Sequence, residues 1–166
     1  KRSTSTIIGS CVRISEFLLQ SATMNDLAKL AELIKIKNDV DQQISRLVGR
    51  PALIGHVGEY IAAKLFDIHL ADSASMKSID GHFRSGALAW KSANIKWYAK
   101  QDGLLDITPA ALPDFYLVLT GPVSPAQSSR GDVRPWLIER VFLFQAAELV
   151  EKLQFRGVKI GVATSV

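Results

Sequence analysis

The sequence predicts an α/β protein: a mixed central β-sheet flanked by helices, with an N-terminal helical extension. Short segments rich in branched and aromatic residues follow one another from residue 78 to residue 144, as expected of strands. Segments with helical spacing of apolar residues come before and after them, an order that favours a sheet covered by helices. We expect residues 51–166 to form the α/β core. Residues 1–50 would be a helical segment of the same domain or a dimerisation element.

The N-terminal segment, residues 1–50, is expected to be helical. Apolar residues recur in it near helical spacing: Leu27, Leu30, Ile34 and Leu47. Polar residues crowd the middle of the segment, which suits a helix that lies on a body or pairs with a second copy better than a fully buried one. Pro51 disfavours a helical residue before it, so the helix should end near Gly49.

The remaining elements follow from apolar runs and the turn residues between them. A second helix is predicted over residues 55–66 and a third over residues 145–153. We predict strands at residues 78–83, 87–90, 93–99, 114–121, 136–144 and 158–166. The strand at 114–121 should be buried at the centre of the sheet, and the strand at 158–166 should close the sheet. Residues 121–135 form a loop rich in Pro, Ser and Gly, of a length typical of functional or mobile loops.

Composition sets broad limits on function. The chain has 166 residues, 48% of them hydrophobic and 22% charged, with a net charge of +4, which is a mild bias towards anionic partners. Cys11 is the only cysteine, which fits a reducing compartment. No apolar run approaches the roughly 18 residues needed to span a bilayer, and the basic start does not resemble a signal peptide. We therefore expect a cytoplasmic protein with no membrane partner.

One acidic residue lies where an apolar residue would be expected. Helical spacing places Glu59 on the apolar arc of helix 55–66, beside Ala63 and Phe66. A carboxylate on such an arc is costly unless something compensates its charge. Glu59 is therefore either at an edge where it reaches water or part of a functional site.

A second set of polar side chains comes from two predicted strands. Because side chains alternate along a strand, Asp80 and His82 share one face, and Asn94 and Lys96 share a face of the later strand. If the two strands pair, Asp80 and Lys96 meet above the sheet, and Glu59 could approach the same face. The alternative is that these are unrelated solvated charges.

An acid on one strand followed by an acid-x-lysine pattern on the next resembles the PD-(D/E)XK nuclease family. That family often also carries a glutamate on the helix before the first of these strands. The matching positions are Asp80 in "SIDG", Lys96 in "NIKWYA" and Glu59 in "GHVGEYIAAKLF". Two positions depart from the pattern: Ile79 replaces the proline before the first acid, and Asn94 stands where the second metal-binding acid is expected.

The resemblance implies a restriction-endonuclease-like core and a Mg²⁺-dependent endodeoxyribonuclease of restriction, repair or mobile-element type. Asp80, Glu59 and the side-chain oxygen of Asn94 would hold Mg²⁺, or Mn²⁺ in its place, since hard cations prefer oxygen ligands. The metal would polarise the scissile phosphate and lower the pKa of a bound water. Lys96 would orient that water or stabilise developing charge. His82 is a spare candidate for the general base.

DNA is the partner that this reading predicts. The candidate phosphate contacts are basic side chains of the core and of the long loop: Lys91, Lys100, Arg84, Arg130 and Arg134. Two alternatives stay open. The chain could be a nucleic-acid-binding module of the same fold without catalysis, which Asn94 favours, or an assembly protein that forms a homodimer through its N-terminal helices.

Overall fold

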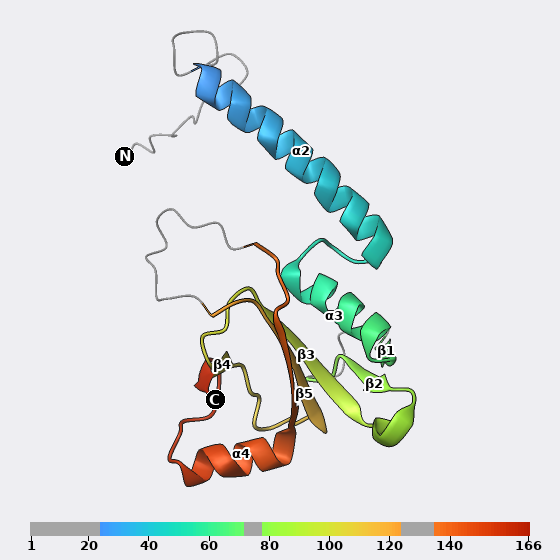
Figure 1. The fold of residues 1–166 in the computed structure, drawn as a ribbon, viewed down its shortest axis with the longest axis vertical. Coiled ribbons are helices and arrows are strands. Elements are labelled where there is room, and N and C mark those ends of the chain that lie inside the picture. Colours follow the sequence, from blue (N-terminus) through green and yellow to red (C-terminus); the bar gives the residue numbers. More distant parts are fainter. Residues whose placement is uncertain (1–23, 72–77, 124–134) are drawn as a thin grey trace, which may run out of the picture. The chain divides into compact units, whose positions relative to one another are not determined.

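The computed structural model describes residues 24–71, 78–123 and 135–166, which form an α/β fold and confirm the predicted fold class (Figure 1). The helices are α2 (Met24–Val48), α3 (Ile54–Leu65) and α4 (Ala146–Phe155), with a 3₁₀ turn, η1 (Gly86–Leu88). The strands are β1 (Ile68–Leu70), β2 (Gly81–Phe83), β3 (Ser92–Tyr98), β4 (Leu104–Leu105), β5 (Phe115–Thr120), β6 (Arg140–Gln145) and β7 (Thr164–Ser165).

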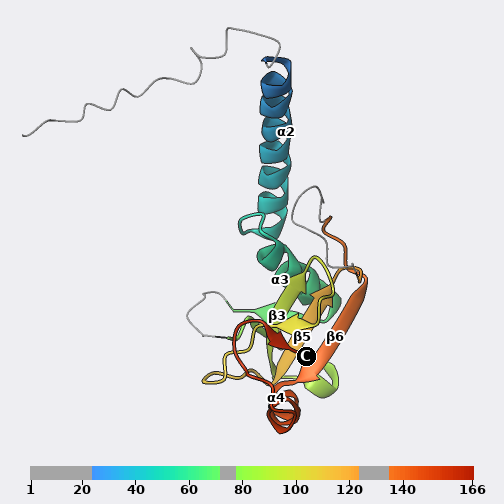
Figure 2. The same cartoon turned by 90° about the vertical axis from the view of Figure 1, so that its left-hand side faces the viewer.

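The central sheet is mixed and has the strand order β1-β2-β3-β5-β6. Its central pair, β3 and β5, is parallel, and the other neighbours are antiparallel. In Figure 2, β3, β5 and β6 run side by side. The buried central strand predicted at 114–121 is confirmed as β5, whose residues from Tyr116 to Thr120 are all buried. A strand with both faces covered is expected at the parallel centre of such a sheet.

Each face of the sheet has its own apolar cluster. On one face, α3 packs on β3 through a cluster that includes Ala62, Ile95 and Trp97. On the other face, α4 packs through a cluster that includes Tyr116 and Leu153. Because side chains alternate along β3, Ile95 and Trp97 point towards α3, and Asn94 and Lys96 belong to the opposite face.

The pairing of β2 with β3 is short. It consists of Gly81 opposite Ala93 and His82 opposite Ser92, and the backbone N–H of Asp80 then donates to Ala93 O at 2.9 Å. From Asn94 onward, β3 therefore has no strand partner on the β2 side in the described part of the chain. The predicted strand 78–83 begins only at Gly81, so Asp80 lies just before β2, where the two strands separate.

Three strand predictions need correction. The strand at 87–90 is wrong, since these residues form η1 and a turn in which Trp90 has a φ of +68°, as the reversal from β2 into the antiparallel β3 requires. The strand at 158–166 is reduced to β7, which pairs with β4 in a separate two-stranded sheet and does not close the central one. Left-handed residues at Gly157 and Ala163 interrupt the extended backbone there. The strand predicted at 136–144 starts later, as β6.

Other elements agree with expectation or were missed. Helices predicted at 55–66 and 145–153 are confirmed as α3 and α4, and residues 24–48 of the N-terminal segment are helical. Residues 1–23 lie outside the described residues. The edge strand β1 was not predicted, because its three residues resemble the end of the preceding helix. Contacts divide the chain into residues 1–43 and 44–166, a boundary inside α2 and earlier than the predicted one after residue 50.

The close approach of α3 to β3 depends on a glycine. A Cβ added to Gly58 would lie 2.9 Å from Cβ of Trp97, closer than such atoms approach in proteins. The adjacent residue on the helix is Glu59, so this contact also sets the distance of Glu59 from β3. A Cβ added to Gly55, one turn earlier, would meet open space, with no other atom within 4 Å.

We predict that Gly58→Ala lowers the free energy of unfolding by about 1–3 kcal/mol, because the added methyl group overpacks the α3–β3 contact. Gly55→Ala is the matched control on the same helix and should raise it by up to about 1 kcal/mol, since alanine favours the helical backbone. Urea unfolding of the two variants measures both effects. Equal stabilisation by the two substitutions would contradict the close packing of α3 on β3.

Candidate functional site

The candidate site lies at the open edge of β3, where β2 leaves it. One oxygen of the Asp80 carboxylate, Oδ2, accepts a hydrogen bond from the backbone N–H of Ile95 at 2.6 Å. This N–H belongs to the stretch of β3 that β2 no longer covers, and an unpaired N–H there would be costly. The Asp80 side chain thus replaces the missing strand and is held in place by the backbone of β3.

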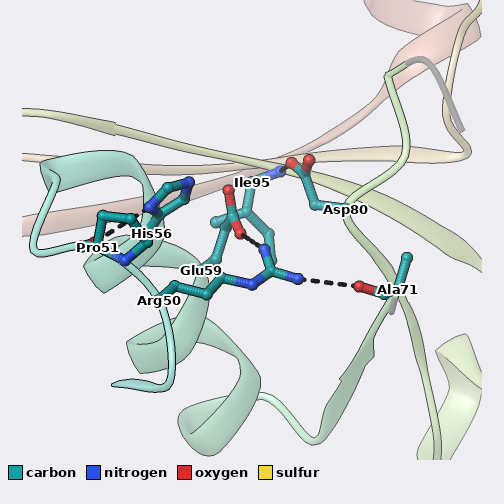
Figure 3. A network of polar contacts seen from close by, with 7 residues as sticks. All are labelled: Arg50, Pro51, His56, Glu59, Ala71, Asp80 and Ile95. Carbon is teal, nitrogen blue, oxygen red and sulfur yellow. Dashed lines mark hydrogen bonds and ion pairs between the residues drawn. The ribbon is translucent and has the colours of Figure 1, made fainter. Parts of the chain in front are cut away.

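Glu59 reaches this edge from α3. Figure 3 shows the carboxylates of Glu59 and Asp80 near the backbone of Ile95. Glu59 Oε2 accepts a hydrogen bond from Arg50 Nη1 at 2.6 Å, and only 15% of the Glu59 side chain is exposed. Glu59 is thus a partly buried carboxylate with a charged partner.

The electrostatics indicate that several predicted site residues are near one another. Burial and, after it, the negative charge of Asp80 raise the pKa of Glu59, while the positive charges of Arg50, His56 and Lys96 oppose this effect. Burial also raises the pKa of Asp80, against the hydrogen bond from Ile95 and the charges of Lys96 and Arg50. Glu59, Asp80 and Lys96 therefore share one electrostatic environment, although three separate segments carry them.

The arrangement differs in one respect from the sequence-based expectation. Glu59 was expected to approach the same sheet face as Lys96, but α3 covers the opposite face, that of Ile95. The carboxylates of Glu59 and Asp80 lie together at the edge of β3 that β2 leaves open. Asp80 and Lys96 were expected to meet above the sheet, but no direct ion pair joins them within 4 Å in the described residues.

Asn94 adds a buried polar atom. The residue is 3% exposed, and its Oδ1 has no hydrogen-bond partner in the part of the chain that the structure describes. A buried acceptor of this kind costs free energy unless a ligand or water binds it. Asn94 directly precedes Ile95, to which Asp80 binds, so its backbone belongs to the same open stretch of β3, and its side chain points to the sheet face opposite α3.

The donor atoms are suitable for a hard divalent cation. Two adjacent carboxylates, half-buried or more, and one unpaired amide oxygen are ligand types that Mg²⁺ and Mn²⁺ accept. No group of three or more His, Cys, Asp or Glu side chains able to hold a metal ion occurs in residues 24–71, 78–123 and 135–166. Two carboxylates would therefore need the amide oxygen, water or substrate to complete the coordination, as is common for Mg²⁺.

Two residues of the site were not predicted, Arg50 and His56. Arg50 lies between α2 and α3, directly before Pro51, and His56 lies one turn before Glu59 on α3. The sequence signal for Arg50 was indirect: an acid on an apolar helical arc requires a compensating charge. His82, the predicted spare base, pairs with His69 and Ser92 across β1 and β3, and His56 is the histidine whose charge acts on Glu59.

Three of the five predicted phosphate contacts form ion pairs with acids near them in the fold. Lys91 pairs with Asp114 at 3.3 Å, Lys100 with Asp102 at 3.1 Å, and Arg84 with Asp67. Each cation is thus already engaged with a neighbouring acid. The other two predicted contacts, Arg130 and Arg134, and most of the loop 121–135 lie outside the described residues.

The aspartate before β5 has a structural role. Asp114 Oδ2 accepts hydrogen bonds from the backbone N–H and the hydroxyl of Ser92 at 2.8 and 2.7 Å, which joins the starts of β3 and β5. These bonds hold the pKa of Asp114 below its usual value. Asp114 thus caps the start of β5.

Comparison with known proteins finds no matching family model and no curated protein that matches the sequence. The resemblance to PD-(D/E)XK nucleases therefore depends on the motif residues themselves. No helix in the described residues is long and apolar enough to cross a membrane.

The raised pKa of Asp80 predicts a particular pH dependence of stability. A carboxyl group whose pKa is higher in the folded state binds its proton more tightly there, so its ionisation destabilises the fold as pH rises above the ordinary carboxyl pKa. Asp80→Asn keeps an oxygen acceptor for the Ile95 N–H and removes the charge. Its free energy of unfolding relative to the unsubstituted protein should therefore increase with pH.

Asp114→Asn is the matched control with the opposite sign. The pKa of Asp114 is lowered in the folded state, so its contribution to stability is present above the ordinary carboxyl pKa and is lost as pH falls. Relative to the unsubstituted protein, this variant should become less stable as pH rises. Urea unfolding from about pH 3 to about pH 8 in the absence of divalent cations measures both. Parallel trends for the two variants would contradict the assigned environment of Asp80.

Proposed function

We propose that the protein is a metal-dependent nuclease that hydrolyses phosphodiester bonds of DNA at the open edge of β3. The observation that supports this proposal most is the pair of carboxylates, Glu59 and Asp80, which come from two separate segments to the open edge of β3 and on which the charge of Lys96 also acts. Burying two carboxylates side by side costs stability, since both pKa values are raised, in part by burial. Such a cost is typical of functional sites, where perturbed acids gather.

In this proposal Asp80 and Glu59 hold Mg²⁺ or Mn²⁺, and the unpaired Oδ1 of Asn94 is available as a neutral oxygen ligand. When bound, the cation supplies Lewis-acid activation of the phosphate and of water. The hydrogen bond from Ile95 fixes the orientation of Asp80, and the ion pair with Arg50 fixes that of Glu59. The protein's contribution is thus a pair of acids oriented before substrate binds.

Lys96 would act on the substrate. Its ammonium group does not pair with Asp80 within 4 Å in the described structure, yet its charge is felt by both carboxylates. A lysine that is not paired with either carboxylate can stabilise the negative charge that develops on phosphoryl oxygens or orient the attacking water. The sheet holds the backbone of Lys96 opposite Val118 on β5, which limits its movement.

A nucleic-acid-binding module without catalysis is the second candidate. The observation that favours it is Asn94 itself, because an amide brings no negative charge to a site that has only two nearby acids in the described part of the chain. Such a module would bind DNA with an affinity that falls steeply with salt concentration and would not cleave it.

Cleavage of supercoiled and linear DNA with Mg²⁺ or Mn²⁺ tests the proposal. We expect metal-dependent cleavage by the unsubstituted protein and a loss of at least about a hundredfold in rate for Asp80→Ala and Lys96→Ala. Lys152→Ala is the matched lysine control, since Lys152 is exposed on α4 and pairs with Glu148. This control should retain full activity.

Absence of cleavage with either metal would count against catalysis. If Asn94→Asp or Asn94→Glu then restores cleavage, the missing carboxylate is the cause, and the unsubstituted protein is an inactive relative. If neither does, and DNA binding is still seen at low salt, the binding-module function replaces the nuclease proposal.

We also propose that α2 joins two copies of the chain. The helix exposes 46–57% of four apolar residues, Leu30, Leu33, Ile36 and Val40. An exposed apolar helical face of this extent is typical of a surface that a partner buries. The helix carries an acid, Asp26, in its first turn and a base in its last. An antiparallel second copy brings opposite charges together at both ends and opposes the helix dipoles, which favours this occupant.

Light scattering over a range of concentrations measures this association. We expect a dimer that Ile36→Glu with Val40→Glu converts to a monomer, because the pair buries two charges in the contact. Lys35→Glu with Asp39→Lys, on the polar arc of the same helix, is the control and should leave the dimer intact. A monomer at all concentrations, or a dimer that survives the first pair of substitutions, would contradict the proposal.

A further inference from the structure

Arg50 connects Glu59 on α3 to the backbone of Ala71, which follows β1. It follows α2, and its guanidinium donates two hydrogen bonds, from Nη1 to Glu59 Oε2 at 2.6 Å and from Nη2 to Ala71 O at 3.0 Å. Figure 3 shows the guanidinium between these two groups. About a third of the Arg50 side chain is exposed. A planar group with two separate acceptors is held more firmly than a surface ion pair.

We infer that Arg50 is the built-in counter-cation of the carboxylate pair and that it weakens the binding of a free divalent cation there. The inference rests on the proposed metal site. Without a metal, Arg50 is the cation in direct contact with Glu59 in the described structure, and its charge also acts on Asp80. It therefore offsets the repulsion between two acids that must stay ionised in a partly buried place.

The same position makes Arg50 a competitor of the metal. Glu59 Oε2 is engaged with the guanidinium, and a divalent ion bound by Glu59 and Asp80 would lie near a fixed positive charge. Repulsion between a divalent and a monovalent cation is twice that between two monovalent ones and is poorly screened in a partly buried site. Because the bond to Ala71 O anchors Arg50 independently of Glu59, the guanidinium stays nearby when a metal binds.

This arrangement has a consequence for substrate binding. Mg²⁺ sites with one or two carboxylates commonly take substrate phosphates as additional ligands. A phosphate brought to the site carries negative charge, which offsets the excess positive charge of the metal and Arg50 together. Arg50 is thus a positioning residue that holds Glu59 and keeps the affinity for metal alone low.

Binding of Mn²⁺ alone, followed by the electron paramagnetic resonance signal of free Mn²⁺, tests the role of Arg50 without any activity assay. Arg50→Gln should bind Mn²⁺ roughly tenfold more tightly than the unsubstituted protein, because the repelling charge is gone. Arg50→Lys retains the charge and should stay within about twofold. Asp80→Asn should abolish the site and defines the background.

The outcomes separate the two proposals. If neither the unsubstituted protein nor Arg50→Gln binds Mn²⁺ above the Asp80→Asn background, the proposed metal site fails and this inference fails with it. If binding depends on Asp80 but Arg50→Gln leaves it unchanged or weaker, only the role of Arg50 is overturned. Arg50→Gln leaves Glu59 uncompensated and can unfold the protein. Arg50→Met, which removes the charge but keeps the packing of the aliphatic side chain, then gives the same comparison, and circular dichroism shows which variant is folded.

Discussion

Two carboxylates in partly buried positions beside one strand are the constraint on which the site depends. Glu59 and Asp80 come from α3 and from the residue before β2, and each is stabilised differently. Asp80 accepts a hydrogen bond from the Ile95 N–H, whereas Glu59 accepts one from the guanidinium of Arg50. Neither compensation restores the ordinary pKa, because burial is the larger effect for both acids. Burial of the two carboxylates thus lowers the stability of the fold, and such a loss of stability is common at functional sites.

The fold supplies this constraint through one irregularity in its sheet. If β2 continued alongside β3, the N–H of Ile95 would bind a backbone carbonyl, and Asp80 would have no reason to lie at the edge. The early separation of the two strands leaves a gap that a side chain fills. On the other side of the same gap, Gly58 lets α3 approach Trp97 closely enough for Glu59 to reach the edge. Both features depend on backbone geometry more than on charged residues.

The cations around the site differ in how they are held, and this difference separates their roles. Arg50 is fixed by two hydrogen bonds and belongs to the resting structure. The charge of Lys96 lowers the pKa of both carboxylates, but Lys96 forms no direct ion pair with Asp80 in the described residues. In the proposed function its ammonium group is therefore available to bind a substrate. Lys91, Lys100 and Arg84 pair with local acids and stabilise strand ends and turns. A positive net charge alone would not have distinguished these three uses of a basic side chain.

The sequence by itself determined the fold class, α3, β3, β5 and α4, and the candidate set Glu59, Asp80, Asn94 and Lys96. It could do so because apolar periodicity reports directly on helices and on well-covered strands. The tertiary structure decided where the site is. Residues from 87 to 90 and from 158 to 166 carry apolar patterns suited to strands, yet chain reversal and the available strand partners override them. The sheet edge brings Glu59 and Asp80 together, and Arg50 and His56 act on Glu59 there. Such contacts depend on distances between segments far apart in the chain, which no local pattern encodes.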